Sequence, residues 1–144
     1  MKIIPISIVI PIRPELDKSP GTLRVWMQER RSSDELNGAL EFAGGKIEAN
    51  ESPLKAALRE LQEETGVTLT KDSLIPFSVY DHTYQLKDKT TKTVQLHAFI
   101  CEDPKATFAE DGWFKVSSVW REEFAGKIPS ANYRIFEDLV KEFL

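Results

Sequence analysis

The chain of 144 residues has few of the residue types that build disulfide frameworks or zinc sites. It contains one cysteine, Cys101, and two histidines. An internal disulfide is therefore excluded, and a Cys/His zinc cluster is not expected. The sequence also lacks an apolar run long enough to cross a bilayer, and its first residues do not have the layout of a signal peptide. We therefore expect a cytoplasmic protein with no membrane partner.

The chain also has fewer basic residues than acidic ones. The 19 Lys and Arg residues are outnumbered by 23 Asp and Glu residues, which gives a net charge of −4. Proteins that bind nucleic-acid backbones in general are normally basic, so this class of function is not expected. A small nucleotide remains compatible with an acidic chain, because a bound divalent cation reverses the local field. The length predicts one domain, residues 1–144, which is large enough to bury a core, as a monomer or homodimer.

Hydrophobic patterning predicts strands on both sides of a central helix, with further helices near the C-terminal end. Such an order favours an α/β fold in which helices cover both faces of a mixed sheet. Helices are expected after the caps Ser52, Ser117 or Ser118, and Ser130. Strands are expected over residues 1–12, 23–30, 39–43, 74–84, 92–101 and 113–116, and loops over 13–22, 31–38 and 102–111. The strands over 74–84 and 92–101 are expected to form a hairpin. Gly44 and Gly45 let the backbone turn sharply, so a structural turn is their simplest interpretation.

The central helix has a sequence signal at each end. Ser52 is a good N-cap, and Pro53 suits the first helical position, where its missing N–H costs nothing. Gly66 suits the left-handed residue just beyond the last turn. Between them, apolar residues recur at i, i+3, i+4 and i+7, which predicts one buried stripe: Leu54, Ala57, Leu58 and Leu61.

Glu60, Glu63 and Glu64 lie within an arc of about 100° on this helix, beside the apolar stripe. Like charges at these spacings repel each other, unless a cation sits among them. Grouped carboxylate oxygens suit Mg²⁺ or Mn²⁺, and such ions commonly hold substrate phosphates. The alternative is an ordinary solvated helix face, since glutamate is a strong helix former.

The stretch from Gly45 to Val67 resembles the Nudix box, with every fixed position of that pattern occupied. The segments 40–48, 59–64 and 129–132 resemble the MutT branch of the family more narrowly. One departure is Ala43, since MutT-type chains usually carry proline before the double glycine. The resemblance implies an α/β/α sandwich and a metal-dependent enzyme that hydrolyses nucleoside diphosphate-linked compounds.

The resemblance also implies roles for individual residues. Glu60, Glu63 and Glu64 would be the catalytic residues, with Glu60 as the general base. Divalent ions would be held by Gly44, through its carbonyl, and by Glu60, Glu63, Glu64 and Glu110. Glu102, Asp103 and Asp111 are the alternatives to Glu110. Four positions of the box are expected to be structural: Gly45, Glu51, Arg59 and Gly66.

Three residues outside the box are expected to contact the substrate. Arg30 occupies the place of a substrate-contacting arginine in the MutT pattern, and its alternative is an ordinary solvated charge. Phe42 would flank the base, or it is a core residue. Asn132 would read a purine edge with its donor and acceptor pair, or it caps the last helix. His82 and His97 have no nearby cysteine or carboxylate at the spacing of metal ligands and are expected to be packed or surface residues.

The resemblance therefore implies the hydrolysis of a purine nucleoside triphosphate, oxidised or normal, to the monophosphate and pyrophosphate. Two alternatives stay open at this point. One is another Nudix activity, on ADP-ribose, a dinucleoside polyphosphate or an RNA 5′ end, because the residues of the box recognise only the diphosphate group of the substrate. The other is a nucleotide-binding module that keeps the fold without turnover, since function belongs to sites and not to folds.

Overall fold

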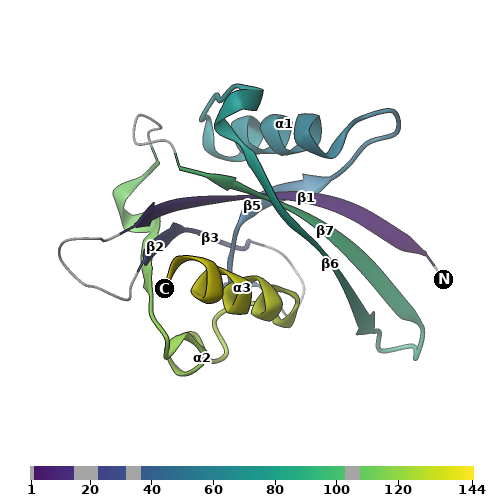
Figure 1. Cartoon of the computed structure of the whole chain (residues 1–144). Coiled ribbons are helices and arrows are strands. Elements are labelled where there is room, and N and C mark those ends of the chain that lie inside the picture. The colour runs from purple at the N-terminus through teal and green to yellow at the C-terminus, as the bar shows by residue number, and fades with distance from the viewer. Residues whose placement is uncertain (1, 15–22, 32–36, 103–107) are drawn as a thin grey trace. The chain divides into compact units, whose positions relative to one another are not determined.

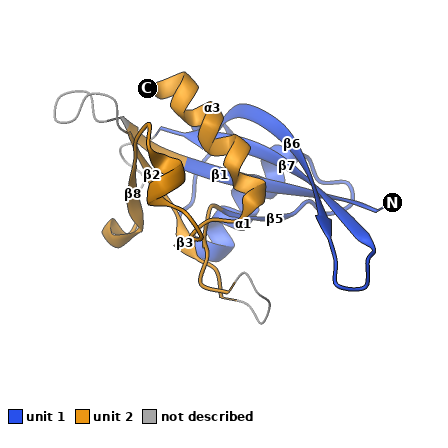
Figure 2. Cartoon of the chain, turned by 90° about the horizontal axis from the view of Figure 1, so that it is seen from below, with its two compact units in different colours: residues 1–10, 43–106 blue, residues 11–42, 107–144 orange. Residues whose placement is uncertain are grey.

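The computed structural model describes residues 2–14, 23–31, 37–102 and 108–144 (Figure 1). The chain forms two compact units, coloured separately in Figure 2. Unit 1 consists of residues 1–10 and 43–106, and unit 2 of residues 11–42 and 107–144. The long strand β1 (Ile3–Pro14) contributes to both units. Each unit combines strands with at least one helix, so the predicted α/β class is confirmed.

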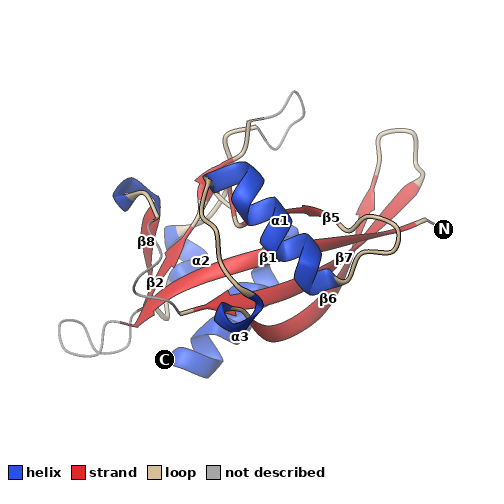
Figure 3. Ribbon diagram, turned by 90° about the horizontal axis from the view of Figure 1, so that it is seen from above, coloured by secondary structure: helices blue, strands red, loops and turns tan. Residues whose placement is uncertain are grey.

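Unit 1 is built on a sheet with one long helix. Strand β6 (Ile75–Gln85) pairs antiparallel with β7 (Thr91–Cys101), which confirms the predicted hairpin, and β7 lies next to β1. Strand β5 (Ala43–Lys46) pairs antiparallel with β1. Helix α1 (Pro53–Thr65) follows β5, and a short 3-10 turn, η1 (Lys71–Ser73), leads into β6 (Figure 3).

Unit 2 contains shorter elements. Strand β2 (Leu23–Trp26) pairs antiparallel with the end of β1 and with β8 (Trp113–Val116), while β3 (Gln28–Glu29) pairs with β4 (Leu40–Glu41). Two 3-10 turns, η2 (Glu110–Gly112) and η3 (Ser130–Asn132), precede β8 and α3 respectively. The helices are α2 (Trp120–Glu123) and α3 (Tyr133–Phe143).

The buried residues follow the predicted apolar segments. In unit 1 the core comes from β1, β5, α1 and β7, and in unit 2 from β2, β8 and α3, where aromatic rings gather around Phe136. Core residues with no more than 1% exposure include Val9, Ala43, Ala57 and Leu61 in unit 1, and Val25, Val116, Ile135 and Phe136 in unit 2.

The structure corrects several predicted boundaries. Strand β1 extends to Pro14, so the predicted loop begins later, and its residues 15–22 lie outside the described residues. The strand predicted over 23–30 is interrupted at Met27, whose N–H donates to the Gly112 carbonyl. The prediction that Ser130 caps the last helix is wrong, because Ser130 begins the 3-10 turn η3 and α3 starts at Tyr133.

Candidate functional site

Helix α1 begins and ends where the local chemistry predicts. The Ser52 hydroxyl accepts a hydrogen bond from the Lys55 N–H at 3.1 Å, and Pro53 is the first helical residue. At the other end Gly66 is left-handed, with φ of +77°, and its N–H donates to the Gln62 carbonyl at 2.9 Å. Both predicted ends are confirmed, and they fix which residues of the box are helical.

The buried face of α1 differs slightly from the predicted stripe. Ala56, Ala57 and Leu61 are buried, whereas Leu54 and Leu58 are only half-buried. The small Ala56 side chain therefore faces the core in place of the larger leucines. Because two alanines line this face, the helix backbone can lie close to the structure beneath it.

The double glycine lies inside a strand, and not in the turn that was the simplest interpretation. Gly44 and Gly45 belong to β5, where they pair with Ile8 and Ser7 of β1. A Cβ atom at Gly44 would collide with the Ser7 carbonyl, and one at Gly45 would collide with the Glu60 carboxylate. Glycine is required here because of close approach: the backbone of β5 directly supports the Glu60 side chain.

Arg59 organises the carboxylates of the box. Its Nε and Nη2 atoms donate to the two carboxylate oxygens of Glu51, each at 2.8 Å, and Nη1 donates to Glu60 Oε1 at 2.8 Å. Longer contacts run from Nη1 to Glu63 Oε2 at 3.4 Å and to Glu48 Oε1 at 3.9 Å. Four carboxylates therefore share one guanidinium, which leaves a local excess of negative charge.

The same contacts shift the protonation of the ion pair. The hydrogen bonds from Arg59 and from the Glu48 N–H lower the pKa of Glu51 from 4.5 to about 2. The hydrogen bond to Glu51, and to a lesser extent the one to Glu60, raises the pKa of Arg59. Both groups are therefore charged near neutral pH. The pair ties the loop before α1 to the second turn of the helix, together with a hydrogen bond from Arg59 Nη2 to the Lys46 carbonyl at 3.1 Å.

The three predicted catalytic glutamates have different surroundings. Glu60 is largely buried, with 16% of its side chain exposed, whereas 54% of the Glu63 side chain is exposed. Glu64 Oε2 accepts a hydrogen bond from the Gly44 N–H at 3.3 Å. Among the described residues, no three acidic, histidine or cysteine side chains are grouped so that they would hold a metal ion as they stand. The carboxylates point to Arg59 and Gly44 instead.

The donor set nevertheless fits a divalent cation in its chemistry. Glu60, Glu63 and Glu64 supply hard carboxylate oxygens from one helix, and the Gly44 carbonyl lies on the strand that Glu60 contacts. The excess of negative charge around Arg59 favours a further cation at the same place. These observations support the predicted ligand set, whose assignment to an ion remains a proposal.

Glu110, the additional ligand suggested by the resemblance, is the first residue of η2 in unit 2. Its side chain is 83% exposed and forms an ion pair with Arg13 at 3.4 Å. The Arg13 guanidinium also lies over the Trp113 ring, 4.1 Å from its centroid. Asp111 and Glu102 are exposed as well, and Asp103 lies outside the described residues.

Two of the predicted substrate contacts lie at the β3–β4 hairpin of unit 2. Arg30 follows β3, and its guanidinium forms an ion pair with Glu41 at 3.3 Å. Backbone hydrogen bonds with Ala39 and Gly38 fix its position in the chain. Phe42 is only 4% exposed and packs against Phe136, which is the environment of a core residue. The structure thus favours the core interpretation of Phe42.

Asn132, the third predicted substrate contact, ends η3 and directly precedes α3. It is 8% exposed, which is unusual for an asparagine. Within residues 108–144 its side chain makes no capping hydrogen bond to the first turn of α3. Capping, which was the alternative interpretation of this residue, therefore does not explain why asparagine stands here.

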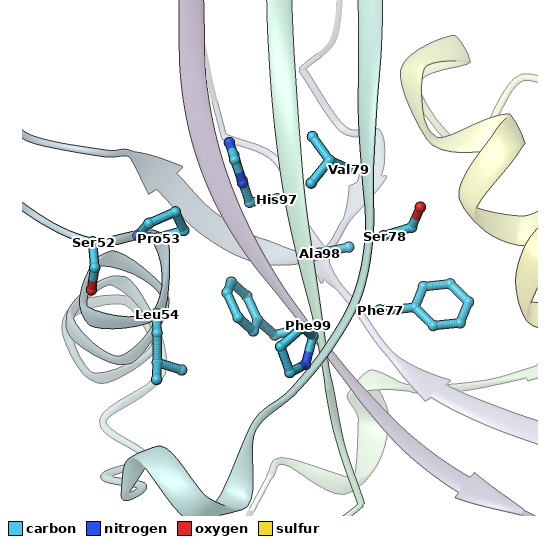
Figure 4. Close-up of a pocket in the computed structure, with 10 residues that line it drawn as sticks. Ser52, Pro53, Leu54, Phe77, Ser78, Val79, His97, Ala98 and Phe99 are labelled. Carbon is cyan, nitrogen blue, oxygen red and sulfur yellow. The ribbon is translucent and has the colours of Figure 1, made fainter.

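The two histidines are located on the β6–β7 hairpin, as predicted. The His97 ring forms a hydrogen bond with Gln95 Oε1 at 2.9 Å, and burial lowers its pKa. His97 also lines a pocket of about 350 Å³ between the first turn of α1 and the two hairpin strands (Figure 4). The pocket is mainly apolar, and none of the predicted catalytic carboxylates lines it.

Sequence reasoning missed two groups that the structure brings to the box. One is the Lys46 carbonyl, for which a side-chain pattern gives no signal. The other is Ser7, which is fully buried on β1 and donates a hydrogen bond from its hydroxyl to the Pro53 carbonyl at 2.6 Å. A lone hydroxyl inside an otherwise apolar strand was the available signal.

None of the helices in the described part of the chain has the length and apolar character needed to cross a membrane.

Comparison with known proteins gives consistent results. The family model of the NUDIX domain matches residues 6–138. An 8-oxo-dGTP diphosphatase of Proteus vulgaris is 42% identical over 57 residues, which are 40% of this chain and 51% of that protein. An 8-oxo-dGTP diphosphatase of Haemophilus influenzae is 27% identical over 126 residues, 83% of each chain.

Among solved structures, the MutT NUDIX hydrolase from Burkholderia pseudomallei aligns with a TM-score of 0.65 at 18% identity, over 96% of this chain and 99% of that chain. At this identity the similarity concerns the fold.

Proposed function

Because the chain belongs to the Nudix hydrolase family, as a MutT-like member, we propose that it hydrolyses a purine nucleoside triphosphate to the monophosphate and pyrophosphate. The observation that carries this proposal is the arrangement of the box. Glu60 rests on the backbone of Gly45 and is held by Arg59, beside Glu63 and Glu64. The single family match extends through both compact units and supports the prediction of one functional domain over residues 1–144.

Divalent cations are needed for this chemistry, because charge on the phosphoryl oxygens must be neutralised and a water must be activated near neutral pH. Nudix hydrolases as a family use such ions. We propose Mg²⁺, or Mn²⁺ in its place, with Glu60, Glu63, Glu64 and the Gly44 carbonyl as ligands. The ion would offset the negative charge of these carboxylates and of the substrate diphosphate. Glu110 would be an additional ligand after release from Arg13.

Within this site the residues of the chain have distinct roles. Glu60 would accept the proton of the attacking water at its carboxylate, which Arg59 and the Gly45 backbone hold in one position. Arg59 and Glu51 would not take part in the chemistry, and their bidentate pair would keep the loop against the helix. Gly66 would end the helix beyond the last glutamate.

Recognition of the base would depend on unit 2. We propose that the Asn132 amide, which does not cap α3, bonds to the purine edge. Arg30 would contact the nucleotide from the β3–β4 hairpin after exchanging its contact with Glu41. The names of the curated relatives support an oxidised guanine nucleotide as the substrate.

The proposal is tested by measuring turnover on a panel of substrates with Mg²⁺ and by identifying the products. We expect the highest kcat/KM for 8-oxo-dGTP, and release of pyrophosphate and not of single phosphate. Chelation with excess EDTA should abolish turnover, and added Mg²⁺ or Mn²⁺ should restore it.

A preference for ADP-ribose, a dinucleoside polyphosphate or a 5′-triphosphorylated RNA would replace the proposed substrate and leave the family assignment unchanged. Binding of nucleotides with no turnover on any panel member would favour the binding-module alternative.

A further inference from the structure

Ser7 is the one fully buried polar side chain among the described residues of unit 1. It stands between Ile6 and Ile8 in an apolar strand, where a valine would bury more apolar surface. Burying a hydroxyl is unfavourable unless it forms a hydrogen bond. The Ser7 hydroxyl forms such a bond, by donating to the Pro53 carbonyl at 2.6 Å. Strand β1 is therefore tied directly to the first residue of α1.

The acceptor of this bond and the predicted base lie on the same side of α1. Pro53 and Glu60 are seven residues apart, which is two helical turns less about 20°, or about 10.5 Å along the axis. Glu60 contacts Gly45, and Gly45 is the register partner of Ser7 across β1 and β5. One face of the helix thus meets this pair of strands at Pro53 and at Glu60. Side-chain hydrogen bonds join the helix to β5 as well, from Arg59 to the Lys46 carbonyl and from the Gly44 N–H to Glu64, whereas the bond from Ser7 is accepted by the helix backbone itself.

The contacts at Pro53 and at Glu60 have different chemistry. The contact between Glu60 and Gly45 is a close packing contact, which limits how near the helix comes but does not by itself prevent it from turning. The hydrogen bond from Ser7 is directional. A rotation of the helix by about 10° would move a side-chain tip, at a radius of about 5–6 Å, by about 1 Å. Misplacement of a catalytic group by about 1 Å can cost roughly a hundredfold in rate.

We propose that Ser7 is a positioning residue for the hydrolysis, whose hydroxyl fixes the rotation of α1 and thereby holds the Glu60 carboxylate on the backbone of Gly45. The inference rests on the proposed function. It assigns to β1, outside the box, a hydroxyl that orients the backbone of the catalytic helix.

The test compares Ser7→Thr with Ser7→Val, two variants of nearly equal size that differ in the hydroxyl. Ser7→Thr should keep the native kcat within about twofold. Ser7→Val should lower kcat by about ten- to a hundredfold, with KM for the nucleotide within about twofold. Ser7→Ala provides a second variant without the hydroxyl, should Ser7→Val not fold. Equal kcat for variants with and without the hydroxyl would overturn the proposal.

Two further measurements separate positioning from a general loss of stability. Thr93→Val is the matched control, because Thr93 is also buried and its hydroxyl bonds to Thr83 at 2.8 Å across the hairpin. This control should change Tm without changing kcat. A parallel fall of Tm and kcat in Thr93→Val and Ser7→Val would show that Ser7 acts through stability alone and would overturn the proposal.

The second measurement does not depend on turnover. Amide hydrogen exchange over residues 54–60 should be faster in Ser7→Val than in Ser7→Thr, and Mn²⁺, titrated into the free protein, should bind more weakly to Ser7→Val. Equal exchange and equal Mn²⁺ affinity in the two variants would refute positioning even if the native enzyme is active. Absence of turnover in the native protein, with the exchange difference present, would refute the proposed function and leave Ser7 as a group that orients α1.

Discussion

Arg59 holds Glu51 through both of its carboxylate oxygens, with Nε and Nη2 each at 2.8 Å, and the same guanidinium reaches Glu60 through Nη1. Planar guanidinium and carboxylate groups match in this bidentate geometry, which a lysine would not reproduce. The pair therefore connects a structural glutamate and the proposed catalytic glutamate through one side chain. Its consequences for stability and for turnover can be separated experimentally.

The first prediction concerns the pH dependence of stability. The pKa of Glu51 is about 2 in the folded protein, against 4.5 for the unperturbed group. The carboxylate therefore contributes stability in full above pH 4.5, and this contribution is lost as the pH falls from about 4.5 towards 2.

The variant Glu51→Gln, which removes the titrating carboxylate, tests this prediction. We expect the free energy of unfolding of Glu51→Gln to lie below that of the native protein at pH 7, with the difference shrinking across this window. A difference that stays constant from pH 7 to pH 2, measured by urea unfolding, would show that the ion pair does not stabilise the fold.

The second prediction separates the chemical glutamates from the structural one. Glu60→Gln and Glu64→Gln preserve shape and remove charge, so each should lower kcat by about a hundredfold or more. Glu51→Gln should lower kcat less and Tm more, because its partner is Arg59 and not the substrate. Steady-state kinetics and thermal unfolding of the three variants provide the comparison. Equal losses of kcat in all three at unchanged Tm would contradict this division of roles.

The third prediction follows from the contact between Gly45 and Glu60. Gly45→Ala places a methyl group against the Glu60 carboxylate, which must move away. We expect kcat to fall at least about tenfold, since the base is displaced from its support. Gly44→Ala should instead destabilise the protein, because its methyl group meets the backbone carbonyl of Ser7, which cannot swing aside. Native kcat in folded Gly45→Ala would mean that Glu60 does not need its contact with Gly45 of β5 in order to act.

The fourth prediction uses Gly66 as a control at the other end of α1. Its φ of +77° is unfavourable for a residue with a Cβ, while no atom lies within 4 Å of the added methyl group among the described residues. Gly66→Ala should therefore cost about 1 kcal/mol of stability through the backbone alone. Turnover below the melting transition should stay near the native value. A loss of turnover without a loss of stability would assign Gly66 a role beyond ending the helix.

The fifth prediction concerns base recognition by Asn132. If its amide bonds to the purine edge, Asn132→Ala should reduce discrimination between 8-oxo-dGTP and dGTP by about 1–3 kcal/mol and leave metal dependence intact. The measurement is the ratio of the two kcat/KM values in the native and variant proteins. Asn132→Asp, which keeps the shape but exchanges donors for acceptors, is the matched variant. An unchanged ratio in both variants would remove Asn132 from the recognition of the base.

The ends of α1 were determined by the sequence alone. Ser52, Pro53 and Gly66 act through their own backbone and nearest neighbours, so their effects are local and the sequence predicts them. The α/β class and the β6–β7 hairpin were also predicted, because alternation of apolar residues reports burial directly. The sharing of one helix by Glu60, Glu63 and Glu64 follows from spacing.

Tertiary structure decided the rest, because those features depend on residues that lie far apart in the chain. Spacing could not show that Gly45 supports Glu60 from a neighbouring strand, or that the double glycine belongs to a strand and not to a turn. It could not show that the side chain of Asn132 leaves α3 uncapped, since capping depends on the rotamer. Ser7 and Pro53 are 46 residues apart, and only the packing of α1 on β1 brings the hydroxyl to the carbonyl.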